Sequence, residues 1–347
     1  MRLKGIRRSS NVEVRRGGGR GARAGGLGLV GVLAVLAIGY FTGIDVSPLL
    51  VGGDRQVQQG TPVTQTDSEQ TQFVAQVLTT TENVWAEVFQ QQLGRDYVPP
   101  RVVVFSDVTQ SACGGASGAT GPFYCPSDQK AYLDTQFFAM MSQRMGAGGD
   151  FAAAYVIAHE VAHHVQNQLG ILPQVNALRQ KSSDVEANAL TVRLELMADC
   201  FSGIWAANVQ GLMERGDLDE ALNAARKIGD DYLQKQAGRV PQPHTFTHGT
   251  SAQRSGWFQR GFDSGQVDPS ILANLKNAGT FRINIKHEMV PPEWFESEIY
   301  KKLFVPFDIR DVIFVATPIS PDVESWMIFE RGGKDWVNFC NAERQSL

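Results

Sequence analysis

Cysteine is scarce in this sequence, which holds four in 347 residues. No two of them form a C-x-x-C pair, and this argues against a metal site built from cysteine thiolates. Cys113 and Cys125 lie twelve residues apart around a Gly-rich stretch. In an oxidising compartment a disulfide between them would staple a loop that has little core of its own. Because Cys200 and Cys340 are also present, counting alone does not settle the pairing.

Charge is absent from residues 24–44, a run of 21 residues rich in Leu, Val, Ala and Gly. Such a run is long enough to cross a bilayer as a helix of about 30 Å. Acidic residues are almost absent before it. Residues 1–23 hold eight Arg and Lys residues and one acid, Glu13, so their net charge is +7. Because the whole chain has a net charge of −4, the remaining residues carry −11. The positive-inside rule predicts a basic cytoplasmic tail (1–23), a single-pass membrane anchor (24–44) and a periplasmic or extracellular location for the remainder.

Two other interpretations of this leader are open. A cleaved signal peptide would also contain small residues such as Ala34 and Ala37, but no clear A-x-A cleavage site follows the apolar stretch, which favours an uncleaved anchor. A basic tail can bind nucleic acid, yet its place directly before an apolar span favours anchoring, so no nucleic-acid partner is expected. Residues 45–68, rich in Gly, Gln, Thr and Pro, are predicted to be a linker.

Glycine and proline are absent from residues 151–168, where apolar residues are frequent. The segment is predicted to be a helix, with Asp150 as its N-terminal cap and Gly170 and Pro173 as its stop signal.

This helix contains the HExxH pattern His159-Glu160-x-x-His163. Four residues make slightly more than one helical turn, so the two histidines project toward a single point, which suits zinc. Glu160 leaves the helix beside them and is placed to take a proton from a water bound to the metal. HExxH also arises by chance, mostly in loops or on mixed surfaces, whereas this copy lies in an apolar helix with start and stop signals.

Catalytic zinc needs a third protein ligand and one open position. Residues 184–210 form a second Gly-poor run, broken only at Gly203, in which Glu195 and Asp199 lie four residues apart on one face. Their neighbours are apolar, and an unpaired buried carboxylate is costly. We therefore predict that Glu195 is the third ligand and that Asp199 accepts a hydrogen bond from the free ring nitrogen of a ligand histidine.

Alternatives to this ligand set remain. The two acids could instead form a solvated helix face. Glu186 is nearer in sequence to the histidines, but Leu190 rather than an acid stands four residues after it. The extended HExxHxxGxxH ligand set is excluded, because Gln166 and Leu169 occupy the positions of its glycine and third histidine.

Several motifs resemble those of the bacterial neutral zinc metallopeptidase family of membrane-anchored proteases: HEVAHH, RLELMADC, TFTHGTSAQR and WF-x-RGFDSG. The resemblance covers most of residues 1–266. The paired HExxH and ExxxD motifs are also similar to the gluzincin (thermolysin-like) ligand set, with a longer gap between them. This similarity implies the assignments reached above: His159, His163 and Glu195 as ligands, Glu160 as general base, and Asp199 behind a ligand.

The expected fold class is α+β, with one N-terminal transmembrane helix. A mainly helical, zincin-like metalloprotease domain with a small antiparallel sheet is expected over residues 69–266, followed by a small α+β extension, 267–347, that resembles nothing known to us. Strands are predicted at residues 101–105, 123–125 and 131–134 and, in the extension, at 281–285, 311–316 and 326–329, with a helix at 293–304.

The predicted function is that of a zinc metalloendopeptidase acting on a protein or peptide substrate. Glu160 is its general base, and His248 is the candidate for a second donor to the oxyanion, although a lone loop histidine is more often structural. His244 and His164 are weaker candidates; helix geometry turns His164 about 100° from the ligand face, which predicts a surface position or one behind the ligands.

Two other classes of function stay open. One is a catalytically silent, membrane-tethered binding or assembly protein with a structural zinc site, which would not need the Glu160 carboxylate. The other is a hydrolase of non-peptide amides. The sequence indicates no oligomeric state.

Overall fold

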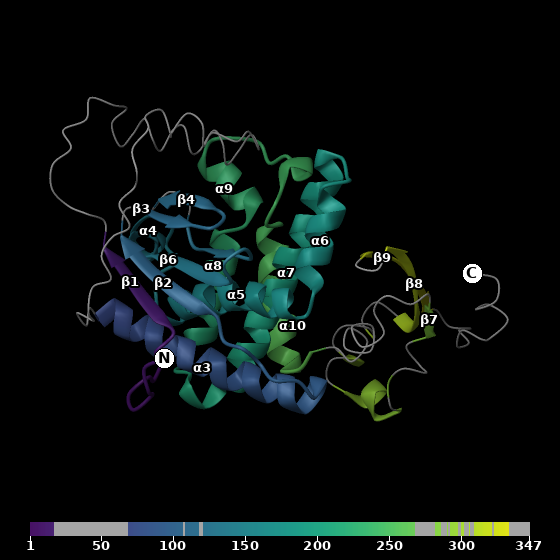
Figure 1. Ribbon diagram of the computed structural model, residues 1–347, viewed down its shortest axis with the longest axis horizontal. Coiled ribbons are helices and arrows are strands. Elements are labelled where there is room, and N and C mark those ends of the chain that lie inside the picture. Colours follow the sequence, from purple (N-terminus) through teal and green to yellow (C-terminus); the bar gives the residue numbers. More distant parts are fainter. Residues whose placement is uncertain are drawn as a thin grey trace.

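Helices predominate around a small sheet in this protein (Figure 1). The structure is a computed structural model that describes residues 1–16 and 69–267, apart from 107 and 118–120, and parts of 282–332. The predicted anchor (24–44) and the predicted linker (45–68) lie outside these residues. Among the residues that are described, no helix is long and apolar enough to cross a bilayer.

The four-stranded sheet is mixed, with the strand order β1-β2-β6-β5. β1 (Val12–Arg16), β2 (Arg101–Ser106) and β6 (Lys130–Asp134) are parallel, and β5 (Phe123–Cys125) runs antiparallel to β6 at the edge. The prediction of an antiparallel sheet is therefore wrong except for the β5–β6 pair. The residue pattern identified β2, β5 and β6 as strands, but β-branched composition does not define the direction of a neighbouring strand.

A separate hairpin joins β3 (Val108–Ser111) to β4 (Gly114–Ser117). Cys113, in its turn, forms a disulfide with Cys125 of β5, which confirms the pairing suggested by their spacing. Cys200 carries a thiol, and the fourth cysteine lies outside the described residues. The disulfide ties the hairpin to the edge strand of the main sheet.

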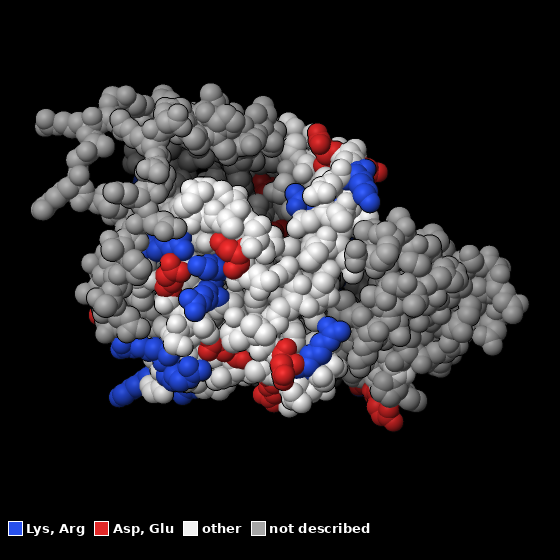
Figure 2. Space-filling model, in the orientation of Figure 1, with Lys and Arg blue, Asp and Glu red and all other residues white. Residues whose placement is uncertain are grey.

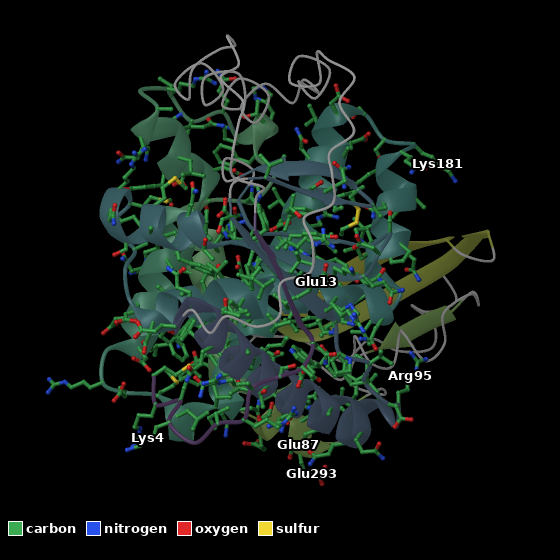
Figure 3. All side chains as sticks on the ribbon, turned by 60° about the vertical axis from the view of Figure 1, so that its left-hand side comes forward. Lys4, Glu13, Glu87, Arg95, Lys181 and Glu293 are labelled. Atoms are coloured by element: carbon green, nitrogen blue, oxygen red, sulfur yellow. A yellow bond between two sulfur atoms is a disulfide. The ribbon has the colours of Figure 1, made fainter. Side chains whose placement is uncertain are left out.

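The N-terminal residues belong to this sheet. β1 pairs with β2 in register from Val12↔Val102 to Arg16↔Ser106. Glu13 of β1 forms ion pairs with Arg15 at 2.8 Å and, two strands away, with Lys130 at 3.2 Å. Figure 3 shows Glu13 over the middle of the molecule, in line with its place in the sheet.

Helix α3 (Glu69–Val88) holds the segment before β1 through the buried Glu82. The Glu82 carboxylate accepts hydrogen bonds from Ser9 Oγ and Asn11 Nδ2 and forms an ion pair with Arg7. Residues 1–16 are thus part of the folded body rather than the separate tail predicted from their charge. A single membrane crossing between β1 and α3 would put β1 and β2 on opposite sides of the bilayer, so this pairing argues against the predicted single-pass orientation.

Three helices form the core around the site: α5 (Asp150–Gln168), α7 (Asp184–Asn208) and α10 (Ser251–Ser264). α5 is the central one, and all but one of its residues from Phe151 to Gln166 are buried. Its N-cap is Gly149 rather than the predicted Asp150, and its chain direction changes at Gly170, whose φ of 77° favours glycine. Pro173 does not act as a stop signal, because it lies in the first turn of α6 (Ile171–Arg179), where proline is tolerated.

Two glycines allow α7 and α10 to pack in backbone contact. A Cβ atom placed on Gly203 would lie 2.1 Å from the carbonyl oxygen of Phe258, and one on Gly261 would lie 1.9 Å from that of Cys200. Any larger residue at either position would force the helices apart. This close approach brings the start of α10 to the part of α7 that carries Glu195 and Asp199.

The remaining helices surround this core. They are η1 (Phe89–Leu93), α4 (Thr135–Arg144), η2 (Gln210–Leu212), α8 (Asp217–Lys227), α9 (Asp230–Gln236) and η3 (Pro243–Thr245). On the face shown in Figure 2, acidic and basic side chains are interspersed toward the edges, and few lie across the centre.

The C-terminal extension contains the three predicted strands, in an antiparallel sheet of order β7-β8-β9 that is yellow in Figure 1. β7 is Arg282–Ile285, and β8 (Ile309–Ser320) and β9 (Val323–Gly332) are longer than the pattern suggests. In place of the start of the predicted helix at 293–304, the described part shows a 3₁₀ helix, η4 (Pro292–Glu296).

Candidate metal centre

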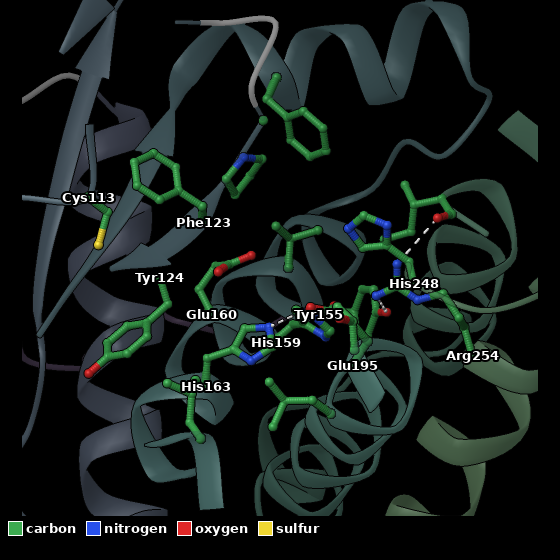
Figure 4. Close-up of a pocket in the computed structure, with 18 of the residues that line it drawn as sticks. Cys113, Phe123, Tyr124, Tyr155, His159, Glu160, His163, Glu195, His248 and Arg254 are labelled. Atoms are coloured by element: carbon green, nitrogen blue, oxygen red, sulfur yellow. Dashed lines mark hydrogen bonds and ion pairs between the residues drawn. The ribbon is translucent and has the colours of Figure 1, made fainter. Parts of the chain in front are cut away.

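The three predicted ligands meet between two helices. His159 and His163 come from α5 and Glu195 from α7, and one ligand atom of each lies within 4.8 Å of the others. The Nε2 atom of His159 is 3.1 Å from Glu195 Oε2, and the Nε2 atom of His163 is 3.4 Å from Oε1 (Figure 4). The i, i+4 spacing on α5 therefore places both imidazoles against one carboxylate, as predicted.

This donor set fits a zinc ion. Two nitrogens and one carboxylate oxygen from a pair of helices make up a common zinc ligand set that leaves a fourth position open. Both histidines are buried and the Glu195 side chain is only 14% exposed, so a cation between them would offset the cost of removing the carboxylate from water. Burial alone would raise the pKa of Glu195, but the two imidazoles hold it well below its usual 4.5, so the group is an anion.

Asp199 lies behind His159, but without the hydrogen bond that the sequence predicted between them. Its Oδ1 atom is 2.9 Å from His159 Nδ1, although the ring N–H is not aligned for a hydrogen bond. The hydroxyl group of Tyr155 donates to the same carboxylate oxygen. Tyr155 is fully buried and orients Asp199.

Arg254 completes this buried network, and sequence reasoning missed it. Its Nε and Nη2 atoms each lie 3.0 Å from an Asp199 oxygen, and Nη1 donates to the carbonyl of Ile228. Burial would raise the pKa of Asp199, but Arg254 and His159 lower it below the usual value. A signal for Arg254 was present in the motif TFTHGTSAQR, where it follows the α10 N-cap Thr250 by about one turn.

Glu160 lies at a cavity of about 660 Å³ beside the three ligands. In Figure 4 its carboxylate points toward Phe123, on the side away from Arg254. Burial raises the pKa of Glu160 above 4.5, against the effect of the two imidazoles. A carboxylate with a raised pKa, next to the open side of a metal site, is suited to accept a proton and return it.

The cavity walls are mostly apolar and lie on both sides of α5, the helix that carries the two histidines. Edge strand β5 and the preceding residues form one wall, with α4 and α6 beside them, and α7 and the loop before α10 form the other. The lining includes Pro122, Phe123, Tyr124, Phe137, Met140, Met145, Leu172, Asn176, Arg179, Leu194, Leu233 and His248.

His248 lies on the same cavity wall as Glu195 and was one of the predicted catalytic residues. Its Nδ1 atom is 3.3 Å from Asp230 Oδ1, and its backbone N–H donates to Asp230 Oδ2 at 2.6 Å. Asp230 also accepts from the backbone N–H groups of Thr247 and Gly249. The loop that carries His248 is therefore fixed by one buried carboxylate.

The other candidate residues lie away from the metal site. His164 is buried rather than on the surface: its Nδ1 atom is 2.9 Å from Tyr124 Oη and its Nε2 atom is 2.7 Å from the Val98 carbonyl oxygen. His244 is exposed in η3. Glu186, the rival third ligand, is exposed in the first turn of α7, where it forms a capping box with Ser183.

Comparison with known proteins agrees with this geometry. Residues 1–270 match the family described as "Putative neutral zinc metallopeptidase". The chain is 46% identical over 283 residues to the protein YpfJ of Escherichia coli K12, covering 78% of this chain and 97% of YpfJ. It is 40% identical over 195 residues to Mb2605 of Mycobacterium bovis, covering 52% of this chain and 64% of that protein. Both relatives are described as uncharacterized, and no solved structure matches. The chain belongs to the neutral zinc metallopeptidase family.

Proposed function

We propose that this protein is a zinc-dependent endopeptidase in which His159, His163 and Glu195 hold the metal and Glu160 is the general base. The observation that carries the proposal is the position of Glu160: it is buried beside the three convergent ligand atoms, at a cavity large enough for a peptide segment. A purely structural zinc site is closed by four protein ligands and needs no base next to it.

Zinc held by these residues would supply Lewis-acid activation of a water molecule and of the scissile carbonyl. Glu160 removes a proton from the attacking water through its carboxylate, and returns that proton to the leaving amine. Burial raises the pKa of Glu160, so its carboxylate accepts the proton of the attacking water more readily than an exposed carboxylate would.

His248 is assigned to the oxyanion that develops on the scissile carbonyl. Asp230 holds the Nδ1 side of its ring, so Nε2 is the atom we assign as the donor to substrate. Such a donor acts only as negative charge develops, so it stabilises the transition state more than the bound substrate.

The substrate is a peptide in extended conformation along β5. This strand is the antiparallel edge of the sheet, and Phe123 and Tyr124 line the cavity beside Glu160. An edge strand offers unpaired backbone groups on its outer side, to which an extended peptide can add as a further strand.

The test is zinc content and turnover of casein or a fluorogenic peptide by the purified full-length protein and its Glu160→Gln variant. The variant is expected to retain zinc and to lose turnover by at least about 100-fold, since general-base catalysis contributes 10²–10⁴-fold. Glu87→Gln, an exposed carboxylate on α3, is the control for loss of charge and should match wild type. Equal turnover by wild type and Glu160→Gln would remove the proposed base.

A further inference from the structure

Gln166 is fully buried and lies three residues after His163 on α5. Its Oε1 atom is 2.9 Å from His163 Nδ1, and its Nε2 atom donates to the carbonyl oxygen of Leu194 at 2.7 Å. Leu194 directly precedes Glu195 on α7. One side chain thus connects a histidine ligand on the first helix to the backbone next to the carboxylate ligand on the second.

The Leu194 carbonyl decides which way the Gln166 amide faces. A carbonyl oxygen accepts hydrogen bonds and cannot donate them, so the Gln166 NH₂ group must be the end that faces Leu194. The amide oxygen then faces His163 and can only accept. Nδ1 of His163 therefore carries the hydrogen in this contact.

This contact selects one form of the imidazole. In a neutral histidine one ring nitrogen is protonated and the other has a lone pair. With the hydrogen on Nδ1, the lone pair is on Nε2, which lies 3.4 Å from Glu195 Oε1. A lone pair and a carboxylate oxygen can face each other at this centre when a cation lies between them. That tautomer binds a metal through Nε2 without first losing a proton, and it keeps the ring plane fixed.

We propose that Gln166 is a positioning residue that fixes the Nδ1–H tautomer of His163 and the spacing between α5 and α7. The proposal rests on the metal site proposed above but not on peptidase activity. It also gives the two histidines different supports: a carboxylate, Asp199, behind His159 and an uncharged amide behind His163.

The test compares Gln166→Met, which has similar length but neither hydrogen bond, with Gln166→Glu, which accepts from Nδ1 but cannot donate to Leu194. Zinc affinity is measured by competition with a chelator, and the His163 ring nitrogen that carries the hydrogen is identified by ¹⁵N–¹H NMR of the zinc-loaded protein. Val165→Ala, also buried on α5, controls for loss of core packing.

Gln166→Met is expected to bind zinc about 10- to 100-fold more weakly, the range typical for loss of a residue that orients a metal ligand. It should also show a mixture of His163 tautomers. Gln166→Glu should keep the Nδ1–H tautomer, while Val165→Ala should lower the melting temperature and bind zinc within about twofold of wild type. If Gln166→Met does not fold, wild type and Gln166→Glu still test the tautomer.

Zinc affinity of Gln166→Met within twofold of wild type, or a wild-type His163 protonated on Nε2, would overturn the proposal. Because no substrate is used, these results are independent of whether the protein cleaves peptides.

Discussion

Arg254 forms two hydrogen bonds with Asp199, from Nε to Oδ2 and from Nη2 to Oδ1, each 3.0 Å long. Asp199 is 0% exposed and Arg254 is 2% exposed, so neither charge reaches water. The pair joins α10 to α7 directly behind His159. Each charge therefore offsets the cost of burying the other. The position of Asp199 behind His159 depends on both residues.

Replacing Arg254 with leucine should destabilise the protein by about 3–5 kcal/mol, because it leaves the Asp199 carboxylate buried and unpaired. Urea denaturation of the Arg254→Leu variant measures this loss. The matched control is Arg260→Leu, on the same helix, which removes an arginine outside the Asp199 contact and should change stability far less.

The same pair should show strong coupling in a double-mutant cycle. The Asp199→Asn/Arg254→Leu variant should be less destabilised than the sum of its single variants, because the second substitution removes the charge that the first leaves unpaired. Additive losses would show that the two groups do not compensate each other.

Replacing His248 with alanine should lower kcat by about 10²–10³, the usual cost of one oxyanion donor, with little change in KM. Zinc content should stay at the wild-type level, since His248 is not one of the three ligands. A rise in KM at unchanged kcat would instead assign His248 to ground-state substrate binding.

Asp230 should make a pH-dependent contribution to stability. Burial would raise its pKa, but the hydrogen bond from His248 and those from backbone N–H groups lower it below 3.8. A carboxyl group whose pKa is lower in the folded than in the unfolded protein stabilises the fold above the unfolded pKa and loses that effect as pH falls through the folded value.

Asp230→Asn should therefore cost about 1–3 kcal/mol at neutral pH, because the amide no longer satisfies all of the donors around it. The difference from wild type should be constant above about pH 5 and should shrink below pH 3.8, where wild-type Asp230 also becomes protonated. Denaturation of both proteins at several pH values across this range measures the difference in their free energy of unfolding. A difference that grows toward low pH would contradict the account.

The β1–β2 pairing predicts that the N-terminal segment and the rest of the described body lie on the same side of any membrane. Lys4 and Lys181 are both exposed and project from the periphery in Figure 3. Lys4→Cys and Lys181→Cys should therefore react alike with a membrane-impermeant maleimide in intact cells, with the unsubstituted chain as the blank. Labelling of Lys181→Cys alone would support the single-pass orientation predicted from charge.

Sequence reasoning was most successful where helical periodicity dictates geometry. His159 and His163 share a face because they are four residues apart, and the same spacing placed Glu195 and Asp199 on one face of α7. The choice of Glu195 over Glu186 agrees with the structure, since Glu186 caps its helix at the surface.

The rest depends on contacts between segments far apart in the chain. The basic composition of residues 1–16 suggested a tail, but charged residues are also typical of an edge strand, where they discourage pairing with other molecules. The roles of Gln166 and Arg254 arise from contacts across helices, with Leu194 and Asp199, which no periodicity within one segment reveals.

The central claim, that α5 and α7 together bind one zinc ion, is tested most directly by metal analysis and zinc K-edge absorption spectroscopy of the full-length protein. We expect one zinc per chain with two imidazole nitrogens at about 2.0–2.1 Å and further oxygen ligands. Glu195→Ala should lose most of its zinc, and Glu186→Ala should retain it. Full zinc occupancy in Glu195→Ala with an unchanged spectrum, or loss of zinc in Glu186→Ala, would contradict the ligand set.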